Sequence, residues 1–363
     1  METYVGLDVH SKKSVFVISD ARGQVTARGE VPTTPEGLGR LRTEYGLAAG
    51  TPIALETGTM AFYAARALQA LELAPVVIDA HEVRLKAHRP MHKSDRRDAF
   101  ELCDGLRRDI YRTRVHVPPP AIVELRETVS RRRHFVRVQT AQVNAVKRLL
   151  RAHGSGQACR TLTTDAAWTR LFGALPAGTA LADFIADHHT VWRAARAQVT
   201  RLEARLVDQQ RPLAASLARL QTVPGVGPIV ALTTLAVFSD VQRFPSAKHA
   251  ASYVGIVPTT HQSGSRDRHG PLTKRGSGEL RAMLCEAAHQ ARHRTSPLHP
   301  YFTTLCARQG YKRAVIALAH RLCRILFALL RDGTDFDARR LGIEEGPFTQ
   351  TVTRRYRLKR LHH

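Results

Sequence analysis

Four carboxylates lie where an isolated charge would be costly or where two acids share one face. Asp8 interrupts the apolar run Tyr4–Val9, Glu56 ends a second apolar run, and Asp95 and Asp98 are three residues apart. A buried carboxylate costs free energy unless a partner compensates it, and Mg²⁺ prefers carboxylate oxygens as ligands. We therefore predict that these acids hold Mg²⁺, with Mn²⁺ able to substitute.

The charge balance indicates a polyanionic partner. The 363 residues include 55 Lys+Arg and 31 Asp+Glu, which gives a net charge of +24. Residues 1–115 hold 17 cations and 15 acids, whereas residues 216–363 hold 23 and 9. Such a charge favours nucleic acid as the partner, and most of the salt dependence of binding is expected from residues 216–363. Together with the acids, it predicts a metal-dependent enzyme acting on nucleic acid.

Several classes of protein are disfavoured. The cysteines contain no CxxC pair, so neither a disulfide framework nor a zinc site is indicated. The N-terminus has no signal-peptide pattern, and the longest apolar run, Pro228–Phe238, is too short to cross a bilayer. We expect a soluble bacterial protein in the cytoplasm, associated with the nucleoid and not with a membrane.

The first 115 residues alternate between strand and helix patterns. Strands are predicted at Tyr4–Val9, Ser14–Ser19, Gln24–Val31, Thr51–Glu56 and Pro75–Asp79, and helices at 35–46, 60–72 and 93–109. This is the element order of a ribonuclease-H-like (RuvC-like) α/β domain. In that layout Asp8 is central on the first strand and Glu56 ends the fourth. Asp95 and Asp98 share a helix face, so the four acids could converge.

Residues 116–215 are predicted to form a helical coiled-coil linker. A Pro-rich break at 117–120 is followed by two seams with heptad-like spacing. The seams comprise Ile122, Leu125, Val129, Val136, Val143, Val146 and Leu150, then Trp192, Ala195, Val199, Leu202 and Leu206. Arg132 and Gln139 interrupt the first seam, and residues 153–190 read as turn-rich. A plain helical subdomain is the alternative.

Residues 216–335 are predicted to form a mainly α-helical second domain, followed by a basic tail at 336–363. The segment Val223-Pro-Gly-Val-Gly227 resembles the turn of a helix-hairpin-helix motif, so the backbone at Gly225 and Gly227 could meet a phosphate. An ordinary glycine-rich turn between helices is the alternative.

A polar, cationic loop between Gly255 and Arg281 contains Ser263. A serine hydroxyl becomes a nucleophile when a base, a metal or a cationic site favours its alkoxide. The cations that could hold a phosphate beside it are Arg266, Arg268, Lys274, Arg275 and Arg281. A loop that only contacts phosphate is the alternative.

These motifs together resemble the Piv/MooV-type transposases, the DEDD recombinases of the insertion sequence one-ten family. The resemblance covers nearly the whole chain. It is carried by Gly6-Leu-Asp8-Val-His10, Ala54-Leu-Glu56-Thr-Gly58, Lys93-Ser-Asp95-Arg-Arg-Asp98, Val223-Pro-Gly-Val-Gly227, Gly255-Ile-Val-Pro258, Ser263-Gly264 and Thr273-Lys-Arg-Gly276.

The resemblance implies a RuvC-like domain, a coiled-coil linker and a C-terminal transposase domain. It implies that Asp8, Glu56, Asp95 and Asp98 bind one or two metal ions, and that Ser263, with Ser265 as the alternative, attacks DNA. It further implies excision and insertion of the protein's own element, guidance by a noncoding bridge RNA, and dimers that assemble into tetramers. In these, the RuvC-like domain of one subunit completes the serine site of another.

Three other functions fit parts of the sequence. A Holliday-junction resolvase or other RuvC-like nuclease would use the acids with water as the nucleophile, but leaves Ser263 without a role. An actin- or hexokinase-like phosphotransferase would need a glycine-rich phosphate loop near Asp8, where the sequence has His10-Ser-Lys-Lys13. An architectural nucleic-acid binder would not need the acids at all.

Overall fold

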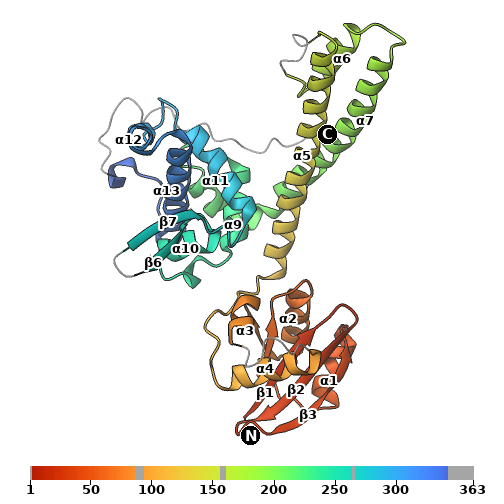
Figure 1. Ribbon diagram of the computed structural model, residues 1–363, viewed down its shortest axis with the longest axis vertical. Coiled ribbons are helices and arrows are strands. Elements are labelled where there is room, and N and C mark those ends of the chain that lie inside the picture. The colour runs from red at the N-terminus through yellow and green to blue at the C-terminus, as the bar shows by residue number, and fades with distance from the viewer. Residues whose placement is uncertain (1, 87–93, 156–160, 264–265, 342–363) are drawn as a thin grey trace. The chain divides into compact units, whose positions relative to one another are not determined.

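The chain folds into two compact units, Met1–Pro118 and Pro119–His363. The computed structural model describes residues 2–86, 94–155, 161–263 and 266–341, with the side chains of 260–263, 266–269 and 341 excepted (Figure 1). Most of the predicted basic tail lies outside these residues. Each unit has its own hydrophobic core and is considered by itself.

Unit 1 is a mixed α/β domain, as the alternation of strand and helix patterns predicts. Its five strands pair in the order β3-β2-β1-β4-β5. β1 pairs antiparallel with β2 and parallel with β4, and β4 continues parallel with β5. The strands are β1 Thr3–Val9, β2 Lys13–Asp20, β3 Val25–Pro32, β4 Pro52–Glu56 and β5 Ala74–Ile78. Since β1 and β4 are parallel neighbours, their carboxyl ends meet at one edge of the sheet.

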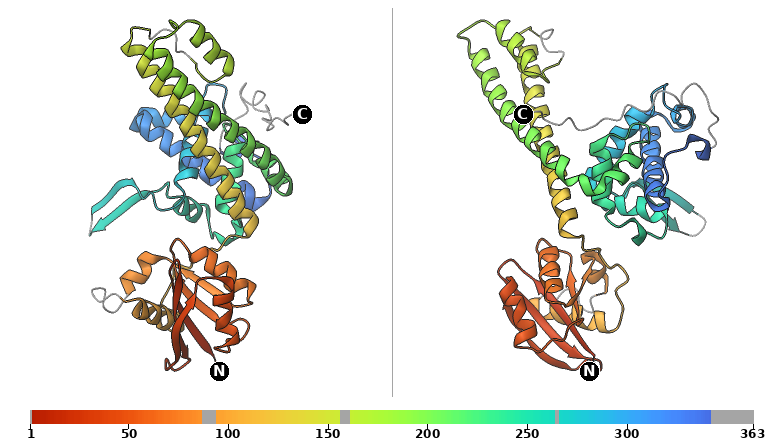
Figure 2. Two further views of the ribbon diagram at one scale, coloured as in Figure 1. Left: turned by 90° about the vertical axis from the view of Figure 1, so that its right-hand side faces the viewer. Right: turned by 180° about the vertical axis from the view of Figure 1, so that it is seen from behind.

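Helices cover both faces of this sheet (Figure 2). The helices are α1 Pro35–Thr43, α2 Ala61–Ala70, α3 Ala80–Lys86 and α4 Asp95–Arg107. α1 and α2 pack on the face that presents Leu7 and Ile53, whereas α4 packs on the face that presents Val15 and Ala54. The short helix α3, which the sequence patterns did not predict, follows β5 directly.

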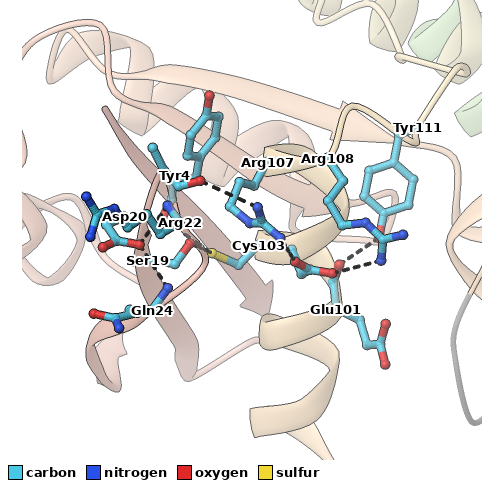
Figure 3. Close-up of polar contacts among 12 residues, drawn as sticks. Tyr4, Ser19, Asp20, Arg22, Gln24, Glu101, Cys103, Arg107, Arg108 and Tyr111 are labelled. Atoms are coloured by element: carbon cyan, nitrogen blue, oxygen red, sulfur yellow. Dashed lines mark hydrogen bonds and ion pairs between the residues drawn. The ribbon is translucent and has the colours of Figure 1, made fainter. Parts of the chain in front are cut away.

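The middle of α4 is fixed to the sheet by a buried thiol. Cys103 Sγ lies 3.2 Å from the hydroxyl oxygen of Ser19 and donates a hydrogen bond to the Tyr4 carbonyl oxygen at 3.3 Å. Figure 3 shows Cys103 between these two strand residues. Because Ser19 and Tyr4 lie on different strands, the thiol ties the helix to both β2 and β1.

Unit 2 begins with two long helices that run antiparallel, α5 Pro120–Ala152 and α7 Ala180–Gln209 (Figure 1). Arg132, a polar interruption of the predicted seam, donates hydrogen bonds to Glu203 Oε1 from Nε at 2.8 Å and from Nη2 at 2.6 Å. The polar seam residue is therefore satisfied across the helix pair, as a part-buried guanidinium requires.

The segment 153–190 was wrongly predicted as turn-rich throughout. It contains α6, Asp165–Gly173, and the first turns of α7. Trp168 and Leu171 of α6 pack with Trp192 of α7 and Leu150 of α5 in a separate small core. The helix has only nine residues, so its periodicity is short, and packing against its neighbours stabilises it.

The rest of unit 2 is mainly helical, as predicted. Its helices are α8 Ala214–Leu220, α9 Pro228–Phe238, α10 Ala247–Val254, α11 Gly278–Ala291, α12 His299–Gln309 and α13 Tyr311–Asp332. Leu125 of α5 and Leu206 of α7 belong to the core of these helices, so the long helix pair is anchored at its base. Within the described residues, no helix combines the length and the apolar character needed to cross a membrane.

The segment predicted as a loop between Gly255 and Arg281 is in part a β-hairpin. β6 Pro258–Ser263 pairs antiparallel with β7 Arg266–Leu272. Apart from Thr259 and Thr260 its residues have low strand propensity, so the sequence shows no strand pattern, although the two strands pair with each other.

Candidate functional site

Two of the predicted metal ligands and one histidine come together at the carboxyl end of β1. His10 Nε2 lies 3.1 Å from Asp8 Oδ2 and 3.5 Å from Asp95 Oδ2. One ligand atom from each of these three residues lies within 4.8 Å of the others. A strand end and the first turn of α4 thus contribute to one cluster, which we call the acid cluster.

A glycine in β1 lets α4 approach the strand closely enough to form this cluster. A Cβ atom added at Gly6 would stand 2.4 Å from the Cys103 backbone nitrogen, closer than atoms can pack. Every second residue of a strand lies on the same face of the sheet. Gly6, Asp8 and His10 therefore lie on the face that α4 covers. The first turn of α4, with Asp95 and Asp98, is thereby held beside the end of β1.

Asp98 and Glu56 lie outside the three-residue group, although both are near it. The charge of Asp98 acts on Asp8, as described below. The parallel pairs Val5–Ile53 and Gly6–Ala54, continued by two residues, bring Asp8 level with Glu56 on the neighbouring strand. Both Asp98 and Glu56 make contacts of their own in the structure. Four acids from three elements therefore approach one end of the sheet.

The environment of Asp8 disfavours its ionised form. Burial raises the pKa of its carboxyl group, and the negative charges of Asp98 and Asp95 raise it further, while His10 lowers it. The side chain of Asp8 is 17% exposed, against 52% for Asp95. A half-buried carboxylate among like charges is typical of a site that binds a cation.

The cluster fits a divalent cation by its donor chemistry. Carboxylate oxygens suit Mg²⁺ and Mn²⁺, and an imidazole nitrogen is compatible with Mn²⁺ and other transition metals. Sequence reasoning missed His10 as a member of the site. Its signal was available, because it stands two residues after Asp8 and so on the same face of the strand.

The predicted nucleophile lies in the β6–β7 hairpin of unit 2. The register pairs Ser263 with Arg266 and His261 with Arg268, so each partner of these two arginines is a polar residue. The side chains of Ser263, Arg266 and Arg268, and the whole of Ser265, lie outside the described residues. Their roles stay predictions.

The other predicted phosphate contacts differ in their availability. Lys274 and Arg275 are exposed on the segment after β7, which Thr273 ties back through a backbone hydrogen bond to the Val257 carbonyl oxygen at 2.9 Å. Arg281, in contrast, donates from Nη1 to the Val254 carbonyl oxygen at 2.7 Å. That hydrogen bond holds the end of α10. Arg281 therefore has a structural role in addition to its predicted role in phosphate binding.

The two glycines of the α8–α9 turn also differ. Gly225 has a φ of 83°, and a Cβ there would stand 2.4 Å from the Ala287 carbonyl oxygen of α11. This glycine is thus required for close packing of the turn on α11. Gly227, at the N-cap of α9, has open space where a Cβ would be.

Family models match both units of the chain. Residues 5–154 match the model of the DEDD transposases of the IS110 type. Residues 217–303 match the model described as "Transposase IS116/IS110/IS902 family". The first match contains all four predicted metal ligands, and the second contains Ser263 and its neighbouring cations.

Individual relatives agree with these models. The chain is 28% identical over 298 residues to a "Probable family 20 transposase" of Pseudomonas aeruginosa, which covers 77% of this chain and 83% of the relative. It is 32% identical over 116 residues to the transposase for insertion sequence element IS1111A of Coxiella burnetii, covering 31% and 32% of the two chains. It is 34% identical over 123 residues to the pilin gene-inverting protein of Moraxella lacunata, covering 33% and 38%.

Proposed function

The chain belongs to the IS110 family of DEDD transposases, and on that premise we propose that it excises and inserts its own insertion sequence by site-specific recombination. The family implies DNA binding, cleavage and rejoining. The observation that carries the proposal is the convergence of Asp8, His10 and Asp95 at the end of β1. A site of this kind suits phosphoryl transfer, in which charge must be held on oxygen.

We assign residues 1–115 as a RuvC-like domain and 116–215 as a coiled-coil linker. Residues 216–335 form the transposase domain, with a helix-hairpin-helix-like motif at the α8–α9 turn, and 336–363 form a basic tail. The antiparallel pairing of α5 and α7 supports the linker assignment. The turn at Gly225 supports the motif assignment, since it joins two helices within few residues.

In the proposed mechanism, Asp8, Glu56, Asp95 and Asp98 would hold one or two Mg²⁺ ions. A bound Mg²⁺ ion would polarise a non-bridging oxygen and stabilise the leaving oxygen. The hydroxyl oxygen of Ser263 attacks the phosphorus, and a bond between phosphorus and the leaving DNA oxygen breaks. The leaving oxygen takes up a proton as the serine gives one up. The resulting phosphoserine ester conserves the bond for rejoining.

Cations of unit 2 are proposed to hold the DNA backbone during this step. Lys274 and Arg275 are exposed and so available to phosphate, and Arg266 stands opposite Ser263 in the hairpin register. Guanidinium groups bind phosphate oxygens with two parallel hydrogen bonds and stabilise developing charge.

Target choice is proposed to come from a noncoding guide RNA that pairs with element and target DNA. The protein would then recognise backbone and duplex shape, which agrees with its large excess of cations over acids. Dimers that assemble into tetramers would bring the acids of one subunit to the serine of another.

An excision assay tests the proposed function. The gene with its native flanking DNA is placed on a plasmid, the protein is expressed, and the flanks are amplified across the element. Rejoined flanks are expected with the wild type and not with Asp98→Asn. Linear or nicked plasmid without rejoined flanks would instead support a nuclease that uses water.

A further inference from the structure

A cationic cavity lies beside the long helix α7 of unit 2, and none of its lining residues was assigned above to the metal site, the serine or the phosphate contacts. Its volume is about 650 Å³, and it opens to solvent. It lies in unit 2 and is lined by residues of α6 and of the middle of α7, from His189 to Arg201. The lining residues are Asp165, Thr169, His189, Arg193, Arg196, Ala197, Thr200 and Arg201.

The lining from α7 forms one stripe of the helix. Residues 189, 193, 196, 197, 200 and 201 are spaced by three, four or one, so they recur on one side over three turns. Three of them are arginines, and Asp165 is the single acid of the lining. The lining therefore carries more positive than negative charge.

One of the three arginines is fixed in place. Arg196 lies with its guanidinium carbon 5.1 Å from the centre of the Trp192 ring, and its Nη1 lies 3.0 Å from Asp165 Oδ2. Both contacts restrict the side chain, since a cation over an aromatic face is attracted to it. Arg196 thus gives the cavity a positive group of defined position.

The other two arginines differ from Arg196. In the part of the chain that the structure describes, neither Arg193 nor Arg201 makes an ion pair, and both are exposed. They are eight residues apart on α7, which corresponds to about 12 Å along the helix axis. Two separated, unpaired guanidinium groups suit an extended polyanion better than a single phosphate.

The floor beneath these arginines is rigid. The Trp168 ring lies 4.7 Å from His189 and 5.4 Å from Trp192, centre to centre, and both tryptophans are buried. Burial lowers the pKa of His189, with the charge of Arg193 acting in the same sense. A neutral histidine adds a hydrogen-bonding group to the cavity without requiring an acidic partner.

From these observations we propose that the cavity between α6 and α7 binds the phosphodiester backbone of a nucleic acid. Arg196 contacts one phosphate from its fixed position, and Arg193 and Arg201 contact phosphates on either side. The inference rests on the proposed function only for its class of ligand. The composition alone attributes most of the nucleic-acid binding to residues 216–363. The proposed cavity adds a contact outside those residues.

The test compares two double variants of the full-length protein that remove the same charge. Arg193→Gln with Arg201→Gln changes the cavity, whereas Arg151→Gln with Arg170→Gln removes two exposed arginines nearby that do not line it. Binding to a labelled single-stranded RNA and a labelled duplex DNA is measured by fluorescence anisotropy over a range of salt concentrations. Circular dichroism melts check that both variants stay folded.

We expect the cavity variant to bind about tenfold more weakly than the control variant to at least one probe. Loss of two phosphate contacts should reduce the slope of log K against log salt by about 1.4 for single-stranded RNA or about 1.8 for duplex DNA. The probe whose slope changes identifies the source of the backbone. Equal weakening by both double variants would overturn the inference.

A third variant should act in the opposite direction. Asp165→Asn removes the negative charge of the lining while Trp192 still holds Arg196, so affinity for the same probe should rise, which misfolding could not produce. Unchanged affinity would also overturn the inference. If the wild-type protein bound neither probe, the proposed function would be refuted as well. That outcome differs from one in which the wild type binds and only the cavity variants behave like their control.

Discussion

Gly6 of β1 lies so close to Ala99 of α4 that a Cβ atom added at Gly6 would stand 2.0 Å from the Ala99 carbonyl oxygen. Helix and strand backbones therefore touch directly at this point. Asp8 follows the contact along β1, and Asp98 precedes it along α4. The spacing of the acid cluster thus depends on a residue that carries no functional group.

Gly6→Ala should impair both folding and activity. The added methyl group must push α4 away, which we expect to lower the free energy of unfolding by about 3 kcal/mol. The displaced acids should reduce DNA cleavage by about a hundredfold in the fraction that remains folded. Urea unfolding and a cleavage assay on the same preparation measure the two effects.

Gly39→Ala provides the matched control. Gly39 lies in α1, and a Cβ there would meet its nearest atom at 3.9 Å, an ordinary contact. This change should leave activity intact and stabilise the helix slightly. If Gly6→Ala behaved like Gly39→Ala, close packing of α4 would not be what positions the acids.

Asp8→Asn should separate stability from function. Burial and nearby carboxylates raise the pKa of Asp8, so its protonated form stabilises the fold at low pH and this contribution is lost as pH rises through the raised pKa. At neutral pH the ionised group is a cost, and its removal should raise the free energy of unfolding by about 1 kcal/mol without added metal. Added Mg²⁺ should stabilise the wild type and not the variant. A less stable variant in metal-free buffer would contradict this account.

Glu82 should make unit 1 sensitive to acid. Although burial opposes ionisation of Glu82, backbone N–H groups of Arg112 and Thr113 and the ammonium group of Lys86 donate to it and lower its pKa to about 2. The donor–acceptor distances are 2.8, 2.6 and 2.6 Å. The ionised group therefore stabilises the fold above its unfolded pKa, and this contribution is lost as pH falls from about 4.5 towards 2.

Accordingly, Glu82→Gln should lower the free energy of unfolding by about 2 kcal/mol at pH 7, with a difference that shrinks towards pH 3. Glu30→Gln, which removes a surface pair with Lys13, should cost less than about 0.5 kcal/mol at either pH. Denaturant titrations at both pH values provide the measurement. A difference for Glu82→Gln that does not depend on pH would count against an ionised Glu82.

Guidance by RNA predicts that the purified protein carries RNA needed for recombination. Ribonuclease treatment of the purified complex should abolish recombination at the element ends, and adding back the extracted RNA should restore it. Sequencing the bound RNA should reveal segments complementary to the element flanks. Full activity after ribonuclease treatment would contradict RNA guidance.

The sequence was most informative where periodicity is strong. The strands of unit 1 were predicted because they are short apolar runs bounded by turn residues, and α5 and most of α7 because their apolar residues repeat over several turns. α6 was missed because its nine residues are too short to establish a period, and the partners of Trp168 and Leu171 lie on other helices. The β6–β7 hairpin was taken for a loop because its residues are polar, although its pairing satisfies the backbone.

The candidate site was likewise predicted only in part. Asp8 and Asp95 were predicted as ligands, and the structure brings them together, but their closeness depends on the Gly6 contact, which no local pattern reveals. His10 was not predicted, because its role depends on Asp95, which comes from a distant segment of the chain. Ser263 stays a prediction from sequence, since its side chain lies outside the described residues.

The most direct test of the central claim is a search for a covalent protein–DNA adduct. Purified protein with its co-purifying RNA is incubated with Mg²⁺ and labelled DNA carrying the element ends, and the products are separated on a denaturing gel. Ser263→Ala, Ser265→Ala and Asp98→Ala are run beside the wild type. The account predicts an adduct with the wild type and with Ser265→Ala, and none with Ser263→Ala or Asp98→Ala. Cleaved DNA without any adduct would contradict it and would identify water as the nucleophile.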